Sequence, residues 1–487
     1  TARHAVSDWM EIEKERGISV TSSVLQFNYE GYCINILDTP GHQDFSEDTY
    51  RTLMAADSAV MVIDGSKGVE AQTIKLFKVC VMRHIPIFTF VNKMDREARD
   101  PFELMSEIEE VLGIHTCPIN WPIGCGKSFK GVYDRQTKKI TTFTAAMGGQ
   151  KEVATETFDV EGTDVDSVIG SDFHAQLRDD IELLDGAGDE LDLEAVRNGK
   201  LSPVFFGSAL TNFGVEPFLK GFLELAPTPR AYNDCLTDTL VDPMSESFSG
   251  FVFKIQANMD KNHRDRIAFV RICSGKFERG MEAYHMQGKK KLKLATGTSL
   301  MADDRAIVDE AYAGDIVGLF DPGIFTIGDT VCAAKNKVQF PAIPMFAPEI
   351  FAKVSQVNTL KRKQFVKGME QLAQEGAIQI FRELGAGMES VIVGAVGVLQ
   401  FEVLEQRLKN EYNVEVRRQG LPYSIIRWVA NPEEVDVPKL NLTHDTYRVE
   451  NMRGEKLLLF TSEWNLRYGI EHNPNLELSE FGNVSFK

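Results

Sequence analysis

The chain has 487 residues, of which 43% are hydrophobic and 25% charged, a balance typical of an ordinary water-soluble protein with about three domains. No stretch approaches the roughly 18 consecutive apolar residues of a membrane span, and no signal peptide is recognisable. The seven cysteines never form a Cys-x-x-Cys pair. This usage disfavours a zinc site and a disulfide scaffold, and it favours the cytoplasm.

The net charge of −18 is unevenly distributed. Residues 151–200 hold 15 acidic and 4 basic side chains, whereas residues 253–295 hold 11 basic and 4 acidic ones. One interpretation is a solvated acidic face beside a basic module. The other is an acidic insertion and a module that faces RNA.

The first part of the chain alternates strand and helix patterns. Residues 24–29 and 32–37 predict a hairpin that turns at Glu30-Gly31. Apolar patterns then predict strands over residues 59–64, 85–91 and 204–207, and helices over residues 69–84, 101–112 and 215–225. Such alternation indicates a mostly parallel sheet with helices on both faces, whose ligands bind at the carboxyl ends of the strands.

From Phe248 onward the sequence pattern changes. Short strand patterns separated by glycine turns predict a small β-barrel that ends near Val338. A proline-rich linker follows, and then helical patterns over residues 361–374 and 398–412 alternate with strands over residues 391–395 and 414–417. We therefore expect an α/β domain over residues 1–235 with an acidic subdomain inserted within about 120–200, a β-barrel over residues 245–340, and an α+β domain over residues 341–487.

A loop with phosphate chemistry follows the strand at residues 32–37. In Asp38-Thr39-Pro40-Gly41-His42, Asp38 can hold Mg²⁺ through water, and Gly41 lets a backbone N–H approach a terminal phosphate. His42 is suited to ordering an attacking water. The alternative is a plain surface turn, because Pro-Gly favours turns in any context.

A second loop, Asn92-Lys93-Met94-Asp95, follows the strand at residues 85–91. The Asp95 carboxylate can accept two N–H groups from the edge of guanine, and the Lys93 stem can lie along the purine. A helix-capping Asn or Asp is the alternative interpretation. The third strand-end loop holds Ser208, Ala209 and Leu210, where small residues let the backbone reach a base carbonyl.

A fourth stretch, Arg16-Gly17-Ile18-Ser19, precedes Asp38 and can supply a hydroxyl to Mg²⁺ and an N–H to the γ-phosphate. Together the four stretches resemble the signatures of the translational GTPases. The resemblance implies a P-loop-type GTPase domain that binds GTP and GDP with Mg²⁺. It implies Mg²⁺ ligands Asp38 and Ser19, catalytic residues His42, Gly41 and Ile18, and base-binding residues Asn92, Lys93, Asp95, Ser208, Ala209 and Leu210.

The resemblance continues beyond the first domain. Residues 270–281 (VRICSGKFERGM) and 313–319 (AGDIVGL) are similar to the β-barrel domain of the same superfamily. Several further stretches resemble the bacterial class II peptide chain release factors: residues 7–10 (SDWM), 121–127 (WPIGCGK), 250–266 (GFVFKIQANMDKNHRDR) and 394–401 (GAVGVLQF). This implies a monomeric cytoplasmic protein that binds the ribosome, releases class I release factors after termination and leaves upon hydrolysis.

Two departures from the superfamily pattern are present. Ser19 stands where most members have Thr, which is expected for the class II release factors. No GxxxxGK[ST] phosphate loop occurs, and residues 124–128 (GCGKS) lack the required first glycine, so we expect that loop to precede Thr1. An elongation factor G-like or ribosome-protection GTPase is the first alternative, although such proteins carry two further domains. A GTPase-dead ribosome-binding module is the second, against which the intact His42 argues.

Overall fold

The computed structural model describes residues 10, 13–14, 19–143, 155–257, 266–294, 297–301, 304–343, 345–388 and 390–480. The chain divides into two compact units. One unit is Ala56–Thr228, and the other combines Thr1–Ala55 with Pro229–Lys487. Within the described part of the chain, no helix combines the length and the apolar character needed to cross a bilayer.

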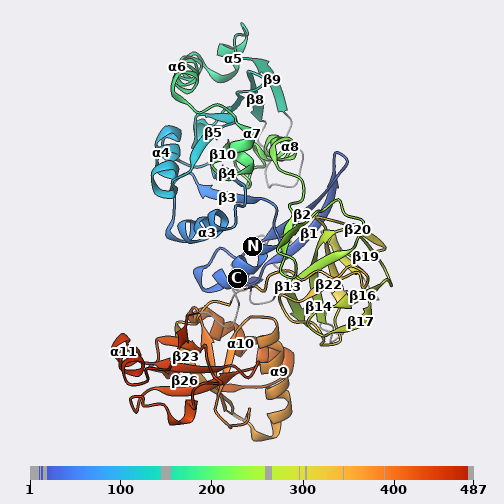
Figure 1. Ribbon diagram of the computed structural model, residues 1–487. Coiled ribbons are helices and arrows are strands. Elements are labelled where there is room, and N and C mark those ends of the chain that lie inside the picture. The colour runs from blue at the N-terminus through green and yellow to red at the C-terminus, as the bar shows by residue number, and fades with distance from the viewer. Residues whose placement is uncertain are drawn as a thin grey trace. The chain divides into compact units, whose positions relative to one another are not determined.

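The unit Ala56–Thr228 is built on a parallel sheet with the strand order β3-β4-β10-β5 (Figure 1). Phe88 and Phe90 of β4 lie two residues apart on one face of the strand and pack against Phe222 and Phe218 of α8. Helices α3 and α4 also belong to this unit, where α3 packs on β3 and α4 on β5. The elements are β3 (Ala59–Asp64), α3 (Ala71–Met82), β4 (Ile87–Asn92), α4 (Pro101–Leu112), β5 (His115–Pro118), α7 (Leu193–Arg197), β10 (Leu201–Phe206) and α8 (Val215–Leu225).

An antiparallel sheet of four strands, β6-β7-β8-β9, follows β5 in the same unit (Figure 1). It is continued by α5 and α6, which contain much of the acidic segment. The buried Trp121 joins sheet and helix, because its Nε1 donates to Asp180 Oδ2 at 2.9 Å. The elements are β6 (Asn120–Ile123), β7 (Gly131–Asp134), β8 (Lys139–Phe143), β9 (Thr155–Asp159), α5 (Val165–Ile169) and α6 (Ser171–Ala187).

The second unit contains the N-terminal hairpin, β1 (Ser23–Tyr29) and β2 (Tyr32–Asp38). The hairpin turns at Glu30 and Gly31, as predicted, and both residues have positive φ angles. However, β1 pairs in parallel with the barrel strand β18 (Gly297–Met301), so the hairpin extends the barrel sheet. In the structure Thr1–Ala55 groups with Pro229–Lys487, and this ladder is one of the contacts that join them. The domain boundaries stay a prediction.

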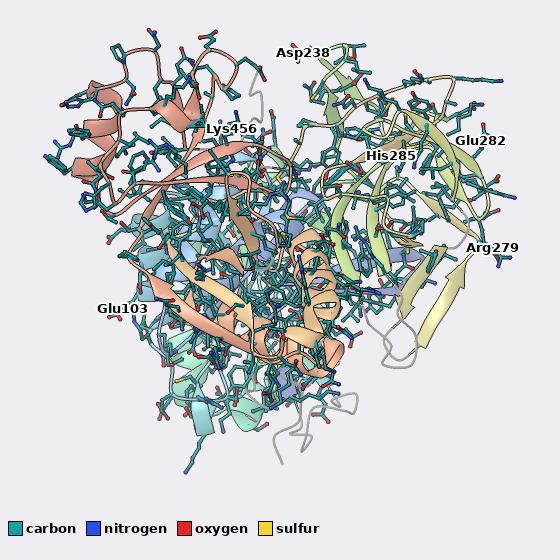
Figure 2. The ribbon with its side chains drawn as sticks, turned by 90° about the horizontal axis from the view of Figure 1, so that it is seen from below. Glu103, Asp238, Arg279, Glu282, His285 and Lys456 are labelled. Atoms are coloured by element: carbon teal, nitrogen blue, oxygen red, sulfur yellow. The ribbon has the colours of Figure 1, made fainter. Side chains whose placement is uncertain are left out.

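The barrel sheet of this unit has the order β17-β16-β22-β13-β14-β21-β18-β1-β2, with β19 paired to β18. Its interior is apolar and includes Val252, Ile255 and Val270. Figure 2 shows His285 inside this region and Glu282 at its rim. The remaining elements are β11 (Tyr232–Asp234), β12 (Thr239–Val241), β13 (Ser249–Ala257), β14 (Arg266–Ser274), β15 (Lys276–Glu278), β16 (Glu282–His285), β17 (Lys290–Lys293), β19 (Asp304–Val308), β20 (Glu310–Tyr312), β21 (Ile316–Phe320) and β22 (Thr330–Cys332).

The C-terminal part of the same unit is an eight-stranded sheet in the order β26-β23-β25-β24-β28-β29-β27-β30. Helices α9 and α10 cover one core, which includes Phe365, Met369 and Leu408. The elements are β23 (Ile350–Gln356), η3 (Thr359–Lys361), α9 (Arg362–Gln374), β24 (Gln379–Glu383), β25 (Ser390–Ala395), α10 (Val398–Tyr412), β26 (Val416–Leu421), β27 (Ile425–Val429), η4 (Val437–Lys439), β28 (Tyr447–Asn451), β29 (Lys456–Phe460), α11 (Glu463–Glu471) and β30 (Leu478–Ser479).

Candidate functional site

The predicted base-binding loops lie at one edge of the parallel sheet. Asp64 of β3 is paired in register with Asn92 of β4, and Val91 is paired with Phe206 of β10. Parallel strands bring their carboxyl ends to the same edge, so the three following loops are neighbours. The structure thus brings together the residues that the sequence predicts for base recognition.

Asn92 joins two of these loops. Its side-chain Oδ1 accepts hydrogen bonds from the backbone N–H of Lys93 at 2.8 Å and of Ala209 at 2.9 Å. Lys93 has a φ of 69°, a left-handed conformation that turns the chain sharply after β4. The alternative interpretation of Asn92 as a helix cap does not hold, because its acceptor atom connects two strand-end loops.

Asp95 and Ser208 form the second connection. The buried Ser208 hydroxyl donates to Asp95 Oδ1 at 2.5 Å, which fixes the carboxylate. Ser208 is itself held by backbone hydrogen bonds in both directions with Phe213, at 2.8 and 2.9 Å. Leu210 lies on the following turn and is 64% exposed. The arrangement presents an oriented carboxylate beside exposed backbone, which suits an edge-on contact with a planar base.

Asp64 belongs to this site although the sequence analysis did not select it. The Lys93 ammonium donates to Asp64 Oδ2 at 2.7 Å. Burial opposes ionisation of Asp64, but the hydrogen bonds from Lys93 and Ser66 outweigh it and hold the pKa of Asp64 well below its usual range. A carboxylate at the end of a third parallel strand was the signal that would have identified it.

The predicted phosphate and metal residues lie in the other compact unit. Asp38 is the last residue of β2 and is paired in register with Ser23 of β1. Ser19 precedes β1, while Ile18 lies outside the described residues. A carboxylate and a hydroxyl are hard oxygen donors of the kind that Mg²⁺ prefers, so this donor set fits that ion.

His42 follows Gly41 and caps the short helix η1 (Gln43–Phe45). Its Nδ1 accepts the backbone N–H of Asp44 at 3.2 Å, and its side chain is 39% exposed. With Nδ1 acting as the acceptor, a neutral imidazole carries its proton on Nε2. Gly41 is exposed and has open space where a Cβ would lie. The ring is therefore held at one nitrogen and can orient a water at the other.

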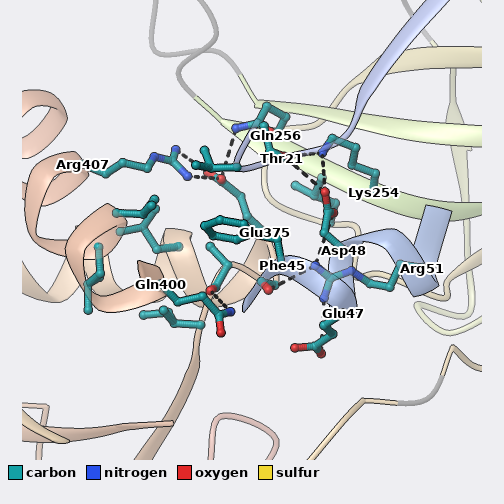
Figure 3. Close-up of a pocket in the computed structure, with 18 of the residues that line it drawn as sticks. Thr21, Phe45, Glu47, Asp48, Arg51, Lys254, Gln256, Glu375, Gln400 and Arg407 are labelled. Atoms are coloured by element: carbon teal, nitrogen blue, oxygen red, sulfur yellow. Dashed lines mark hydrogen bonds and ion pairs between the residues drawn. The ribbon is translucent and has the colours of Figure 1, made fainter. Parts of the chain in front are cut away.

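Helix α2 (Ser46–Met54) follows η1 and borders a small cavity of about 50 Å³ (Figure 3). Asp48 accepts the Ser22 N–H at 2.5 Å and lies 3.7 Å from the buried ammonium of Lys254 on β13. Burial opposes the charge on Asp48, but Lys254 and Arg51 outweigh it and lower the pKa of Asp48 to about 2. Arg51 also donates to the Gly376 carbonyl at 3.1 Å.

A second buried ion pair lies across the same cavity. Arg407 of α10 contacts Glu375 at 2.6 Å, and Glu375 accepts the Ala257 N–H at 3.1 Å (Figure 3). Burial raises the pKa of Glu375 although Arg407 opposes that shift. Sequence reasoning missed this network, because its members lie far apart along the chain and carry no motif.

Comparison with known proteins gives three family matches in chain order. A profile described as "Elongation factor Tu GTP binding domain" matches residues 1–228, and one described as "Elongation factor G domain 2" matches residues 247–334. The profile "Class II release factor RF3, C-terminal domain" matches residues 340–469. A crystal structure of a protein from Thermus thermophilus shares the fold, with a TM-score of 0.67 and 20% identity, and the match covers 87% of this chain and 63% of that one.

Several curated relatives are similar over nearly the whole chain. A "Peptide chain release factor 3" of Symbiobacterium thermophilum is 57% identical over 475 residues, which is 98% of this chain and 89% of the relative. Proteins of the same name from Macrococcus caseolyticus and a Cyanothece species are 51% and 50% identical over 98% of this chain and 90% and 87% of theirs. The predicted fold class and resemblance are confirmed, and the chain belongs to the peptide chain release factor 3 family of translational GTPases.

Proposed function

We propose that this protein binds GTP with Mg²⁺, hydrolyses it on the ribosome, and uses the cycle to release class I release factors after termination. The observation that supports the nucleotide part is the pair of hydrogen bonds Asn92–Ala209 and Ser208–Asp95, which join two loops at one edge of the parallel sheet. Membership in the family supports the termination part.

Guanine recognition rests on acceptor and donor placement. The Asp95 carboxylate, oriented by Ser208, accepts the two N–H groups at the guanine edge. Adenine presents a different donor pattern at that edge, so the carboxylate discriminates against it. The aliphatic stem of Lys93 packs on the purine face while its ammonium stays paired with Asp64. Ala209 and Leu210 supply backbone at the base carbonyl.

Hydrolysis is an attack of water on the γ-phosphorus, which the protein assists by positioning and charge stabilisation. Asp38 and Ser19 would hold Mg²⁺, which neutralises charge on the phosphate oxygens. Gly41 presents its backbone N–H to the terminal phosphate, and His42 orients the water. Ile18 is proposed to shield His42 until the ribosome repositions it. This shielding of His42 makes GTP turnover slow in the absence of the ribosome.

The test follows a labelled class I release factor on post-termination ribosomes. The full-length protein with GTP should accelerate dissociation of that factor, and GDP should not replace GTP. The differential affinity of the two nucleotide states for one ribosomal state sets how far the equilibrium can shift. The same preparation is added to elongating ribosomes as the second arm. Unchanged factor dissociation together with movement of transfer RNA and messenger would overturn the proposal in favour of a translocase.

A further inference from the structure

Helix α10 begins without a side-chain cap of its own. Its N-cap residue is Gly397, which has no side chain, although the first N–H groups of a helix need acceptors. The backbone N–H of Leu399 instead donates to Asp44 Oδ2 at 2.8 Å, across 355 residues of sequence. Asp44 thus caps α10 from a distant part of the chain, whereas a capping Asp ordinarily stands at the N-cap position of its own helix.

The fit between Asp44 and the helix is close. A Cβ added at Gly397 would overlap the carboxyl group of Asp44, so only glycine leaves room for it. Gln400 completes the helix start, because its Oε1 accepts the N–H of Val396 at 2.7 Å and of Gly397 at 3.2 Å. A carboxylate at a helix N-terminus is further stabilised by the helix dipole.

Asp44 also holds His42. Its backbone N–H donates to His42 Nδ1 at 3.2 Å, so the contact runs through the main chain of Asp44, and its side-chain Oδ1, an acceptor like that nitrogen, lies 3.4 Å away without a hydrogen bond to it. Asp44 is 7% exposed, whereas the His42 side chain is 39% exposed. One residue therefore contacts both the start of α10 and the imidazole.

Apolar packing reinforces the contact. Phe45, the next residue, is buried in a cluster with Val403 of α10 and Val20, against which Leu399 also packs. Figure 3 shows Phe45 among the residues that line the cavity, which α2 and α10 both border. Val20, which precedes the N-terminal hairpin, and Phe45, which follows it, thus belong to the same apolar cluster as Val403 of α10.

We propose that Asp44 is a positioning residue for hydrolysis, which transmits the position of helix α10 to the His42 imidazole. This inference rests on the proposed role of His42 in orienting water. When α10 holds the Asp44 carboxylate, the η1 segment and the Nδ1 contact are fixed. When the carboxylate leaves the helix start, His42 samples other orientations, and fewer encounters with the ribosome lead to hydrolysis.

The first measurement does not depend on GTP hydrolysis. Hydrogen–deuterium exchange of a peptide that spans the start of α10 is followed in the full-length protein and in Asp44→Ala. Loss of the cap should accelerate exchange there by about five- to tenfold. Asp44→Asn keeps an acceptor oxygen and should restore most of the protection. Unchanged exchange in Asp44→Ala would overturn the capping contact.

The second measurement is ribosome-stimulated GTP hydrolysis. Asp44→Ala should lower kcat by about fivefold or more and leave the KM for ribosomes within about twofold, because the buried Asp44 is not part of an exposed binding surface. Gly397→Ala should reproduce this loss by displacing the carboxylate. Adding Gly397→Ala to Asp44→Ala should not lower kcat further, since Asp44→Ala has already removed the carboxylate that the alanine at position 397 would displace.

Matched controls separate this role from general destabilisation. Gly420→Ala lies in the same C-terminal sheet with open space at its Cβ, and Gln43→Ala removes an exposed neighbour of His42; both should match wild type. Faster exchange with unchanged kcat in Asp44→Ala would make the cap merely structural and overturn the proposal. Absence of stimulated hydrolysis in wild type would refute the proposed function instead, while the exchange result still decides whether Asp44 caps α10.

Discussion

In the proposed base site, specificity depends on Asp95, whose carboxylate is oriented by Ser208. Asp95→Asn replaces one acceptor by a donor, and an unpaired buried donor costs about 1–3 kcal/mol. Guanine nucleotide affinity should fall by roughly ten- to hundredfold, and affinity for xanthine nucleotides should rise. Titration with fluorescent GDP and XDP measures both. Glu97→Gln, an exposed neighbour with the same charge change, is the control. Unchanged GDP affinity in Asp95→Asn would refute the assignment.

His42 should affect turnover rather than nucleotide binding. In the role proposed for it, the imidazole acts mainly in the transition state, so His42→Ala should leave GTP affinity nearly intact. Ribosome-stimulated hydrolysis should fall by about two orders of magnitude. Single-turnover phosphate release measures the rate, with the exposed His444→Ala as control. Equal rates in His42→Ala and wild type would assign the ring a structural role.

The sequence predicted the residues that stand in contiguous motifs and missed those defined by distant contacts. Asn92, Asp95 and Ser208 were found because each lies at or just after the end of a recognisable strand. Asp64 and Asp44 were missed, since their partners lie on other elements and no contiguous sequence motif marks either residue. The roles of the selected residues remain predictions.

At the scale of the element, helix α2 is anchored by the buried pair Asp48–Lys254. The folded-state pKa of Asp48, about 2, lies below its ordinary value, so the ionised carboxylate stabilises the fold above about pH 4. That contribution, about 2 kcal/mol, should be lost as the pH falls through about 2. Urea unfolding at several pH values should show this loss in wild type and a smaller one in Asp48→Asn.

Removing one partner of the pair is a separate test. Asp48→Asn leaves the buried Lys254 ammonium with its hydroxyl partners Thr21 and Ser22 but without its carboxylate, and should cost about 3–5 kcal/mol at pH 7. The double variant Asp48→Asn with Lys254→Met removes both charges and should recover much of that loss. A double variant no more stable than Asp48→Asn would contradict the pairing.

Elements with strong local signals were predicted well. Helix α4 begins and ends at the predicted residues, because Asp100 caps it, Pro101 occupies its first turn and Gly113 adopts a left-handed φ at its end. Strand β4 begins at Ile87 instead of Ile85, since Pro86 has no N–H for the ladder. The pairing of β1 with β18 was not predictable, because strand register across such separations depends on tertiary packing.

At the scale of the molecule, we expect the basic stretch of the barrel, within residues 253–295, to contribute to ribosome binding. Strand β17 is the edge of its sheet, and Lys291 pairs with Glu282 at 2.8 Å. Lysines also protect sheet edges from unwanted pairing, which is the competing explanation. Neutralising Lys289, Lys290 and Lys291 should weaken ribosome binding and reduce its salt slope by about 1 for each phosphate interaction that is removed.

The control for this charge change removes Lys130, Lys138 and Lys139, which are exposed beside the acidic segment. Binding of labelled protein to ribosomes is titrated at several salt concentrations, and nucleotide affinity is measured in parallel. A salt slope equal to that of wild type would leave Lys289, Lys290 and Lys291 as protection of the sheet edge.

The second compact unit is assembled from two separate stretches of the chain, and this has a consequence for its synthesis. Residues 56–228 are contiguous and emerge from the ribosome together, so they can fold while translation continues. Asp44 must wait for Leu399, 355 residues later, which takes roughly 20 to 70 seconds at about 5–20 residues per second. Throughout that interval the Asp44 carboxylate has no helix to cap. The contact between the His42 segment and α10 therefore forms only after α10 has been translated.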